Sequence, residues 1–389
     1  MSGPLAHLVV LDVATLNAAP QIATFFGDLG ACVVKIEHPS GDRLRRLVDA
    51  NGAALLWKLA NRNKQCVTLD AARPAGRALL ARLLERADLL VSALPAARLA
   101  AWQLDPDTLQ VRHPRLVAVN LTTYGATGPW ADRAGSGTLA EAATGLAHLT
   151  GPADGPPTLA PVGLGDHLGV VHGIVAALTG LLLRDAGGRA FDLSMTEPLL
   201  ALLGQRLAQV ARSGVDPGRR GNRFPTMAPR NTYRAADGRW IAITAGTDEL
   251  VMRLFEVIGR PELREDARFA TNRARLANVD ALDTYIGQWV GARGAGAAVD
   301  ALVTARVSAA VVDDVAAVLA NPHFRARGEL VAVDDPELGP TTMAAPAIRG
   351  LGTIRHLGRA LGADNQAIYG DWLGIDGAEL ERLRADGVI

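Results

Sequence analysis

The 389-residue sequence predicts an α/β protein with a large, doubly wound parallel sheet and a smaller α+β domain. Over the first two hundred residues, short apolar runs alternate with helical runs, a pattern typical of βαβ units. Between residues 214 and 230 the apolar periodicity stops and Gly, Pro, Arg and Asn dominate, which indicates a linker or a functional loop. Further helical and strand-like segments follow, so we expect a second unit there.

The strands of the large sheet are expected at five short apolar runs: 7–12, 31–37, 66–70, 88–92 and 116–120. A helix over 21–29, stopped by Gly30, joins the first two strands into a βαβ unit. Another helix is expected over 74–86, and its proline suits the first helical turn. The alternation predicts parallel strands because crossover helices return the chain to the same end of the sheet.

The first strand-to-helix turn lacks the glycines of a dinucleotide-binding fingerprint. It reads NAAP over 17–20, where G-x-G-x-x-G would otherwise stand. We therefore expect no nicotinamide or flavin nucleotide bound by the usual route.

The second unit is expected to contain one strand followed by three helical segments: 239–244, 249–258, 261–277 and 281–290. Beyond the Asn-Pro pair at 321–322 the chain turns extended over 330–333. It then ends in a charged helix over 377–385. We expect this tail to return to the first domain.

Composition excludes several classes of protein. Forty Lys and Arg residues balance forty Asp and Glu residues, so no basic field attracts nucleic acid. Cys32 and Cys66 lie in separate apolar runs without metal-ligand spacing, which predicts reduced core thiols and no metal site. The N-terminus lacks a signal-peptide pattern, and the longest apolar helix is interrupted by His172 and ends at Arg184. We expect a cytoplasmic protein that binds neither nucleic acid nor a membrane.

Asp166 lies in the run GLGDHLG over 163–169, directly before an apolar helical stretch over 170–183. A carboxylate between glycines at a helix start lies among unpaired backbone N–H groups, and no bulky neighbour blocks a ligand. This is a suitable place for a nucleophile. The simpler interpretation is that Asp166 caps the helix while the glycines form a turn.

Short segments spread along nearly the whole chain are the basis for a family assignment: VLD at 10–12, NAAP at 17–20, GDLGA at 27–31, VKIE at 34–37, NRNK at 61–64, TYGATGP at 123–129, PEL at 261–263, RFATN at 268–272, NP at 321–322 with RARG at 325–328, and LRADGVI at 383–389. In this order they resemble the class III CoA-transferase family, also called the CaiB/BaiF family. A series of this length in the family's order is hard to produce by chance.

The resemblance implies a particular domain organisation. A large CoA-binding, Rossmann-like domain is built from both chain ends, 1–200 and 330–389, a linker covers 201–224, and a small α+β domain with its connecting segment covers 225–329. It also implies an interlocked homodimer, in which two subunits thread through each other. CoA, acyl-CoA and a small carboxylic acid are the expected partners, and no cofactor is expected to be covalently bound at rest.

The resemblance also implies a role for Asp166. The family's catalytic carboxylate is an Asp in a G-x-x-x-D-x-x-x-G-type segment after the Thr-Gly-Pro loop, and Asp166 occupies that position. The implied reaction moves CoA from an acyl-CoA donor to a carboxylic acid through an aspartyl mixed anhydride and an enzyme–CoA thioester. Backbone N–H groups of the nearby glycines would stabilise the oxyanions.

Two alternatives to transfer remain. The family includes α-methylacyl-CoA racemases, which pair the Asp with a His; this chain has Ser136 there, and serine is no base near neutral pH without a partner. The racemase Glu position appears as Asp248, which is weakly compatible with racemase or acyl-CoA isomerase activity. A noncatalytic CoA-binding protein is the other alternative, and the retention of Asp166 argues against it.

The family's CoA-binding positions fall at the strand ends of the large domain, here at His38, Leu69 and the stretch 93–101, which contains Leu94. Arg73 and Arg98 could contact the CoA phosphates or be surface arginines without a ligand. Several depart from the usual pattern, since the frequent Glu-Asn-Phe is Ser-Ala-Leu over 92–94 and a common Arg is Ala101. Arg98 lies one turn earlier on the same helical face.

The substrate pocket is expected to include Asn17 and Ser136. The Asn17 amide can donate to a carboxylate, although a plain turn residue is the simpler interpretation. Three arginines in the glycine-rich loop could clamp a dicarboxylate or lie free in solvent: Arg219, Arg220 and Arg223.

Overall fold

Six parallel strands form the sheet around which the first unit is built. The structure is a computed structural model that describes residues 3–389. The strands are β1 Val9–Asp12, β2 Cys32–Glu37, β3 Lys64–Thr68, β4 Leu89–Ser92, β5 Val117–Thr122 and β6 Ala190–Ser194. Their order is β3-β2-β1-β4-β5-β6, with every neighbouring pair parallel. This is the doubly wound order of Rossmann-like sheets, whose topological switch point lies between β1 and β4.

The five strands expected from the sequence are confirmed, and β6 is an addition. It lies at an edge of the sheet and pairs only with β5; its first three residues are exposed or partly exposed, and Leu193 and Ser194 are buried. A short edge strand of this kind lacks the continuous apolar run that indicates the inner strands.

Helices cover both faces of the sheet. The helices of this unit are α1 Ala18–Asp28, α2 Leu55–Ala60, α3 Pro74–Leu84, α4 Ala96–Ala101, α5 Pro106–Arg112, α6 Gly137–Ala143, α8 Leu164–Leu183, α9 Thr196–Leu203, α16 Pro322–Ala326 and α17 Gly377–Ala385. One face packs on α1, α8 and α9. The other packs on α3, α4, α5 and the C-terminal segment. Successive strand residues such as Val10 and Leu11 enter opposite cores, as a sheet buried on both sides requires.

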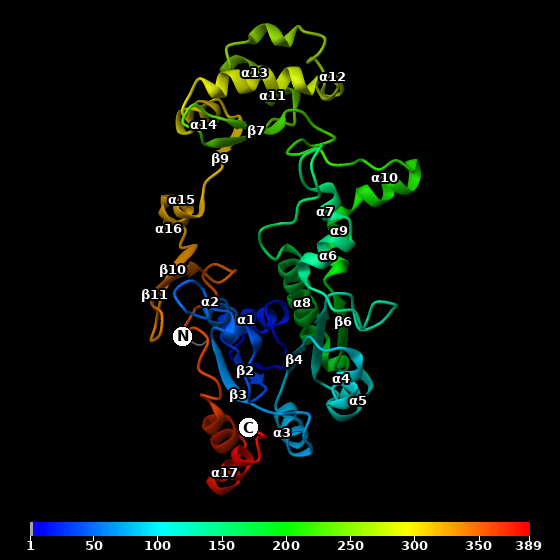
Figure 1. Ribbon diagram of the computed structural model, residues 1–389, viewed down its shortest axis with the longest axis vertical. Helices are drawn as coiled ribbons and strands as arrows, with labels where there is room; N and C mark the ends of the chain where they lie inside the picture. The colour runs from blue at the N-terminus through cyan, green and yellow to red at the C-terminus, as the bar shows by residue number, and fades with distance from the viewer. Residues whose placement is uncertain (1–2) are drawn as a thin grey trace. The chain divides into compact units, whose positions relative to one another are not determined.

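The C-terminal tail packs on the first unit, as predicted. Helix α17 has the predicted bounds, and the preceding π-helix, Gln366–Trp372, adds Tyr369 to the same core. The Asp70 N–H donates to the Val388 carbonyl at 2.8 Å. Figure 1 shows the red end of the chain beside the blue segments around β3 and α3. The extended segment over 330–333 proves to be β10, Leu330–Asp335, which forms an antiparallel hairpin with β11, Gly339–Ala344.

The contacts divide the chain into two units. The first contains 1–146, 160–212 and 322–389, and the second contains 147–159 and 213–321. The strand expected over 239–244 is present as β8 Trp240–Thr244, and the helices expected over 249–258 and 281–290 are present as α11 Asp248–Val257 and α13 Val279–Gly291. The helical segment expected over 261–277 is only partly helical: it contains a 3₁₀ turn, Pro261–Arg264, and α12 Asn272–Ala277, and residues 265–271 between them are not helical. Two further strands, β7 Arg230–Arg234 and β9 Ser308–Val311, flank β8 in an antiparallel sheet, and α14 Ala295–Thr304 and α15 Val315–Ala320 complete the unit.

Four short elements lie near the unit boundaries or in connecting segments. These are α7 Leu146–Leu149, α10 Gln205–Ser213 and two 3₁₀ turns, Arg43–Arg46 and Arg184–Ala186. Residues 214–229 contain no helix or named strand, in agreement with the loss of apolar periodicity there.

Helix α8 packs through small residues. Its buried positions form one stripe: Gly165, Gly169, Val170, Gly173, Ala177 and Gly180. A Cβ at 173 would lie 2.3 Å from Cδ1 of Ile22 in α1, and a Cβ at 180 would lie 2.6 Å from Cγ1 of Val117 in β5. These glycines therefore set how closely the helix approaches α1 and the sheet.

Helix α8 with its following turn, Leu164–Ala186, has the length and apolar character of a membrane-crossing segment, with a mean hydropathy of 1.5; it is the one such helix among residues 3–389. One apolar helix is weak grounds for a membrane span, because core helices share these properties. The packing of α8 against α1, α6 and β5 is consistent with a helix of the α/β layers.

Candidate active site

A cavity of about 620 Å³ lies at the carboxyl ends of β1, β4 and β5. It is therefore at the topological switch point, where open α/β sheets generally bind ligands. Three of the residues predicted for the site line it together: Asn17, Ser136 and Asp166. They come from three separate segments of the chain, so the fold, rather than sequence proximity, brings them together.

Asp166 lies within the first turn of α8. The helix begins at Leu164 and its N-cap is Gly163, so the interpretation of Asp166 as the N-cap is wrong. The helix starts before the predicted stretch. In the sequence the glycines at 163 and 165 suggest a turn, whereas in the structure they allow close packing around the helix start. The Oδ1 atom of Asp166 accepts a hydrogen bond from the backbone N–H of Gly137 at 3.0 Å, and the side chain is only partly buried.

The N-termini of α6 and α8 meet at the carboxylate. A Cβ at Gly137 would lie 2.5 Å from Oδ1 of Asp166, and a Cβ at Gly165 would lie 2.5 Å from the Gly137 carbonyl oxygen. Any larger residue at either position would separate the two helix starts. The positive ends of both helix dipoles therefore lie near the Asp166 carboxylate, which is a favourable place for negative charge.

Glu141 supports this junction, and the sequence interpretation missed it. Its buried carboxylate oxygen Oε1 accepts from the backbone N–H of Gly165 at 3.0 Å, one residue before the candidate nucleophile. A glutamate inside a short helical segment carries no signal in the sequence, since nothing there indicates that it faces another helix start.

Ser136 and Asn17 have defined local roles. Ser136 is the N-cap of α6, and its hydroxyl accepts from the Leu139 N–H at 3.4 Å. Asn17 precedes α1, and its Oδ1 accepts from Nε2 of Gln21 at 3.1 Å. This leaves the Asn17 amide nitrogen available to donate to a ligand in the cavity. Beside it, Leu16 has a φ of 65°, a backbone conformation rare for leucine.

The wall of the cavity contains two polar groups that the sequence interpretation did not select. Thr122, the last residue of β5, has a buried hydroxyl without a hydrogen-bond partner among the described residues 3–389. Arg133 lies in the loop between β5 and α6, and its guanidinium carbon is 4.3 Å from the centre of the Trp130 ring.

The predicted CoA-binding residues lie outside this cavity lining. His38 follows β2, and its Nδ1 is 2.7 Å from the Ser40 hydroxyl. Leu69 and Leu94 follow β3 and β4, and both are buried in the core beneath α3 and α4. His38, Leu69 and Leu94 therefore all lie just beyond the carboxyl ends of strands. The two leucine side chains are buried and expose little surface to a ligand.

The two predicted CoA-binding arginines are both exposed. Arg73 immediately precedes α3 and pairs with Asp70 at 3.1 Å. Arg98 lies on α4 and forms no ion pair within residues 3–389. Neither is held in a preformed phosphate site.

A buried ionic cluster lies behind the cavity. Asp12, Lys35 and Lys64 are fully buried, and the Lys64 Nζ is 2.8 Å from Oδ2 of Asp12 and 3.0 Å from Oδ1 of Asn61. Lys35 Nζ lies 3.5 Å from the other Asp12 oxygen. Burial opposes ionisation of Asp12, but the two lysines outweigh it and lower its pKa below 3.8. Burial also lowers the pKa of Lys64, from 10.5 to about 8.

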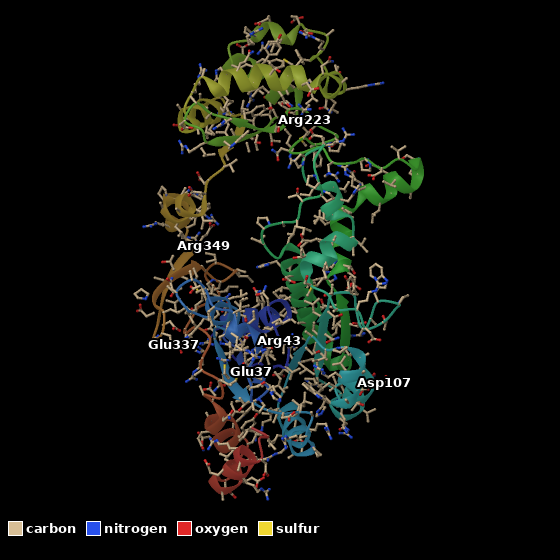
Figure 2. All side chains as sticks on the ribbon, in the orientation of Figure 1. Glu37, Arg43, Asp107, Arg223, Glu337 and Arg349 are labelled. Carbon is tan, nitrogen blue, oxygen red and sulfur yellow. The ribbon has the colours of Figure 1, made fainter. Side chains whose placement is uncertain are left out.

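This cluster explains several of the recognised sequence segments. VLD, VKIE and NRNK contribute Asp12, Lys35, Asn61 and Lys64, and the carbonyl of Pro20 accepts from Lys64 at 2.7 Å. Lys64 thereby ties the start of α1 to β1 and β3. Glu37, labelled in Figure 2, forms a separate ion pair nearby, in which its carboxylate accepts a hydrogen bond from Nε of Arg45 at 2.7 Å. These segments therefore position the loop that carries Asn17.

Charged residues of the second unit are engaged within that unit. Asp248, at the racemase Glu position, pairs with the fully buried Arg275 at 2.6 Å. Arg223, labelled in Figure 2, pairs with Asp280 and Asp283 at 2.7 Å each. Arg219 donates to the backbone carbonyls of Gly155 and His148 at 3.1 and 3.0 Å. Two of the three loop arginines thus have intramolecular partners.

Neither thiol nor metal chemistry has a prepared site in the described chain. Cys32 and Cys66 are both free thiols, and burial raises the pKa of Cys66 to about 11, so its reactive thiolate form is disfavoured. Within residues 3–389, no group of three or more His, Cys, Asp or Glu side chains is placed to hold a metal ion.

Comparisons with known proteins agree with this geometry. A profile described as CoA-transferase family III matches residues 5–364. Succinyl-CoA–D-citramalate CoA-transferase from Chloroflexus aurantiacus is 33% identical, covering 99% of this chain and 98% of that protein. The beta subunit of succinyl-CoA–L-malate CoA-transferase from the same organism is 32% identical with the same coverage.

Solved structures show the same fold. A CaiB/BaiF family protein from Brucella suis superposes with a TM-score of 0.83 at 30% sequence identity, covering 95% of this chain and 100% of that one. Rv3272 from Mycobacterium tuberculosis superposes with a TM-score of 0.84 at 26% identity, covering 94% and 99%.

Proposed function

The chain belongs to CoA-transferase family III and is a CoA-transferase, and on this premise we propose that Asp166 is the nucleophile that carries the transfer. The observation that supports this most directly is the position of Asp166. Its carboxylate lines the cavity at the switch point, beside two helix starts, and has no cationic partner among residues 3–389. An oxygen that is not engaged by a cation keeps its lone pairs available for attack.

The first half of the reaction loads the enzyme. A carboxylate oxygen of Asp166 attacks the thioester carbonyl of the donor, the carbon–sulfur bond breaks, and the CoA thiolate leaves with its electron pair. The product is a mixed anhydride. The thiolate then attacks the Asp166 carboxyl carbon of this anhydride, which releases the donor acid as a carboxylate and leaves CoA joined to Asp166 as a thioester.

The second half reverses these steps with the acceptor. The acceptor carboxylate attacks the carbonyl carbon of the Asp166 thioester, the thiolate leaves, and a second anhydride forms. Attack of the thiolate on the acyl carbonyl of this anhydride yields the new acyl-CoA and restores the Asp166 carboxylate. The Gly137 N–H, already bonded to Oδ1, is placed to stabilise charge that develops on this carboxyl group. No net proton transfer is needed.

We propose dicarboxylic acids as the substrate class. Relatives with similarity over most of this chain are named for citramalate, malate, glutarate and mesaconate. Their donors, where the names give one as a thioester, are succinyl-CoA. The polar wall of the cavity, with Arg133 and Asn17, is consistent with a substrate that carries more than one polar group.

For the CoA moiety we propose the strand-end positions His38, Leu69, Arg73, Leu94 and Arg98. They follow β2, β3 and β4 on the carboxyl side of the sheet, the side on which the cavity opens. The backbone around Leu69 and Leu94, rather than their buried side chains, is the suitable contact. CoA acts here as a substrate, without a resident cofactor.

We propose that the working form is an interlocked homodimer in the cytoplasm. The support is helix α8, whose glycine stripe faces inward and which leaves several large apolar side chains exposed: Val171 and Val175 are each 58% exposed and Leu182 is 86% exposed. A long helix with such an outer face needs a covering surface. Sedimentation of dilute protein should show a dimer at micromolar concentration; a well-folded monomer would contradict the proposal.

Transfer and racemisation are separated by one experiment. CoA transfer from succinyl-CoA to a panel of carboxylic acids is measured beside exchange of the α-proton of 2-methylacyl-CoA. Ser136→Ala should leave transfer within about threefold, because no step of the proposed transfer uses the Ser136 hydroxyl; loss of its helix cap should instead lower stability by roughly 1 kcal/mol. A protein that exchanges the α-proton but transfers CoA to no acid would contradict the proposed chemistry.

A further inference from the structure

We infer that Arg133 is the specificity-determining residue that binds the second carboxylate of a dicarboxylic substrate. This deepens the proposed function and depends on it. The inference starts from the charges of the cavity wall. Among the residues that line it, Asp132 and Asp166 are acidic and Arg133 is the single cation.

A dicarboxylic substrate brings a further negative charge into this cavity. The carboxyl group that reacts must reach Asp166, and at the stages where Asp166 is a free carboxylate, a second substrate carboxylate meets two like charges. Repulsion between like charges in a partly desolvated site is costly unless a cation offsets it. Arg133 is the only lining residue that supplies one.

Arg133 is available for this role. Within residues 3–389 its guanidinium forms no ion pair or hydrogen bond, and its carbon lies over the Trp130 ring, 4.3 Å from the ring centre. Its N–H donors are therefore available, and a guanidinium can bind a carboxylate through two parallel hydrogen bonds. By contrast, Arg219 and Arg223 of the glycine-rich loop already have partners.

The loop that carries Arg133 is held in place. The Trp130 ring packs edge-on against Tyr124, with ring centres 5.2 Å apart. The Ala126 N–H donates to both carboxylate oxygens of Asp192 in β6, at 2.8 and 3.0 Å. A guanidinium positioned by a supported aromatic ring loses little freedom when it binds a ligand.

The test compares two acyl groups that differ at one end. Succinyl-CoA and butyryl-CoA have the same carbon chain, with a carboxylate in the first where the second has a methyl group. Arg133→Gln should lower kcat/KM for succinyl-CoA by about 10- to 100-fold, as loss of a hydrogen-bonded charge pair does. It should change kcat/KM for butyryl-CoA by less than about threefold, and Arg133→Lys should restore part of the succinyl-CoA activity.

Arg86→Gln is the matched control. Arg86 is also an exposed arginine near a tryptophan, with its guanidinium carbon 5.3 Å from the Trp372 ring, and it lies outside the cavity lining. This variant should leave both rates unchanged. An equal fall for both donors after Arg133→Gln would place the arginine on the CoA moiety and overturn the inference, as would no fall for either.

A binding measurement separates this inference from the proposed function. Calorimetric titration of Asp166→Asn protein, with and without Arg133→Gln, reports affinity without turnover. The added substitution should weaken succinyl-CoA binding at least tenfold and leave butyryl-CoA binding within threefold. Equal weakening of both contradicts the role of Arg133 even if catalysis proceeds through Asp166; selective weakening supports it even if transfer proves to use another nucleophile.

Discussion

Asp12 and Asp166 are two aspartates near the carboxyl edge of the same sheet, and they are held in opposite ways. Asp12 is fully buried between Lys35 and Lys64, and its Oδ1 also accepts from the Ala14 N–H at 3.0 Å. Asp166 is partly exposed, and its recorded hydrogen bond is a single backbone N–H from Gly137. One carboxylate is neutralised by cations, and the other faces a cavity.

The difference separates a structural charge from a chemical one. A carboxylate paired with two lysines has its lone pairs engaged, so it is a poor nucleophile, and removing it leaves two cations buried without a counter-ion. A carboxylate held by backbone dipoles keeps one oxygen free to attack. The same residue type therefore serves stability at one position and chemistry at the other, according to what surrounds it.

The largest expected effect is the loss of transfer in Asp166→Asn. An amide is a far weaker nucleophile than a carboxylate, so kcat for CoA transfer should fall by at least about a thousandfold. The Asn carbonyl can still accept from Gly137, so the free energy of unfolding should change by less than about 1 kcal/mol. Steady-state rates and urea denaturation measure the two quantities. Near-normal transfer in this variant would remove Asp166 from the mechanism.

The matched substitution at the buried aspartate, Asp12→Asn, should act on stability instead. Breaking a buried ion pair from one side typically costs about 3–5 kcal/mol, and the midpoint of urea denaturation should fall accordingly. Any protein that remains folded should still form the covalent intermediate at Asp166. If Asp12→Asn proves as stable as the wild type, the lysine cluster does not have the structural role assigned to it.

A smaller effect is expected at the junction of α6 and α8. A Cβ at Gly165 would lie 2.5 Å from a backbone carbonyl oxygen, so Gly165→Ala should cost about 1–3 kcal/mol of stability and lower kcat. Gly296 in α14 is the control, since a Cβ there has nothing within 4 Å. Gly296→Ala should change stability by less than about 1 kcal/mol. Equal behaviour of the two alanine variants would contradict the close packing.

The smallest effect concerns pH. The lysines hold the pKa of Asp12 below its unfolded value of 3.8, so the folded state binds this proton less readily than the unfolded state. The contribution of Asp12 to the free energy of unfolding is complete above pH 3.8. It is lost as the pH falls through the lowered pKa of the folded state, with a slope of up to about 1.4 kcal/mol per pH unit. The stability gap between wild type and Asp12→Asn should therefore narrow below pH 3.8. If the stability difference between the two proteins stays constant in acid, the pKa of Asp12 is not lowered by the lysines.

Much of the fold could be predicted from sequence because the large sheet is buried on both faces. Its inner strands leave continuous apolar runs, and the C-terminal helix shows clear start and stop signals over Gly377–Ala385. The edge strand β6 and the flanking strands β7 and β9 were missed, since each is short and partly exposed. Periodicity detects burial, and these strands are incompletely buried.

The site was only partly predictable. Asp166 is conspicuous because glycines surround it, Asn17 lies in the recognised NAAP segment, and Ser136 stands at the position of the racemase His. Glu141 and Arg133 could not be found in this way, because their significance depends on a helix start at Gly165 and on a cavity wall, both formed by residues distant in sequence. The functions of the buried Lys35 and Lys64 likewise became clear only when their shared partner, Asp12, was placed between them.

The central claim, that Asp166 rather than any paired carboxylate is the covalent nucleophile, is tested most directly by mass spectrometry of the protein mixed with succinyl-CoA. We expect a covalent CoA adduct on the peptide that contains Asp166 in the wild type, the same adduct in any folded Asp12→Asn protein, and none at this position in Asp166→Asn. An adduct that persists undiminished in Asp166→Asn, or that maps to another residue in the wild type, would contradict the account.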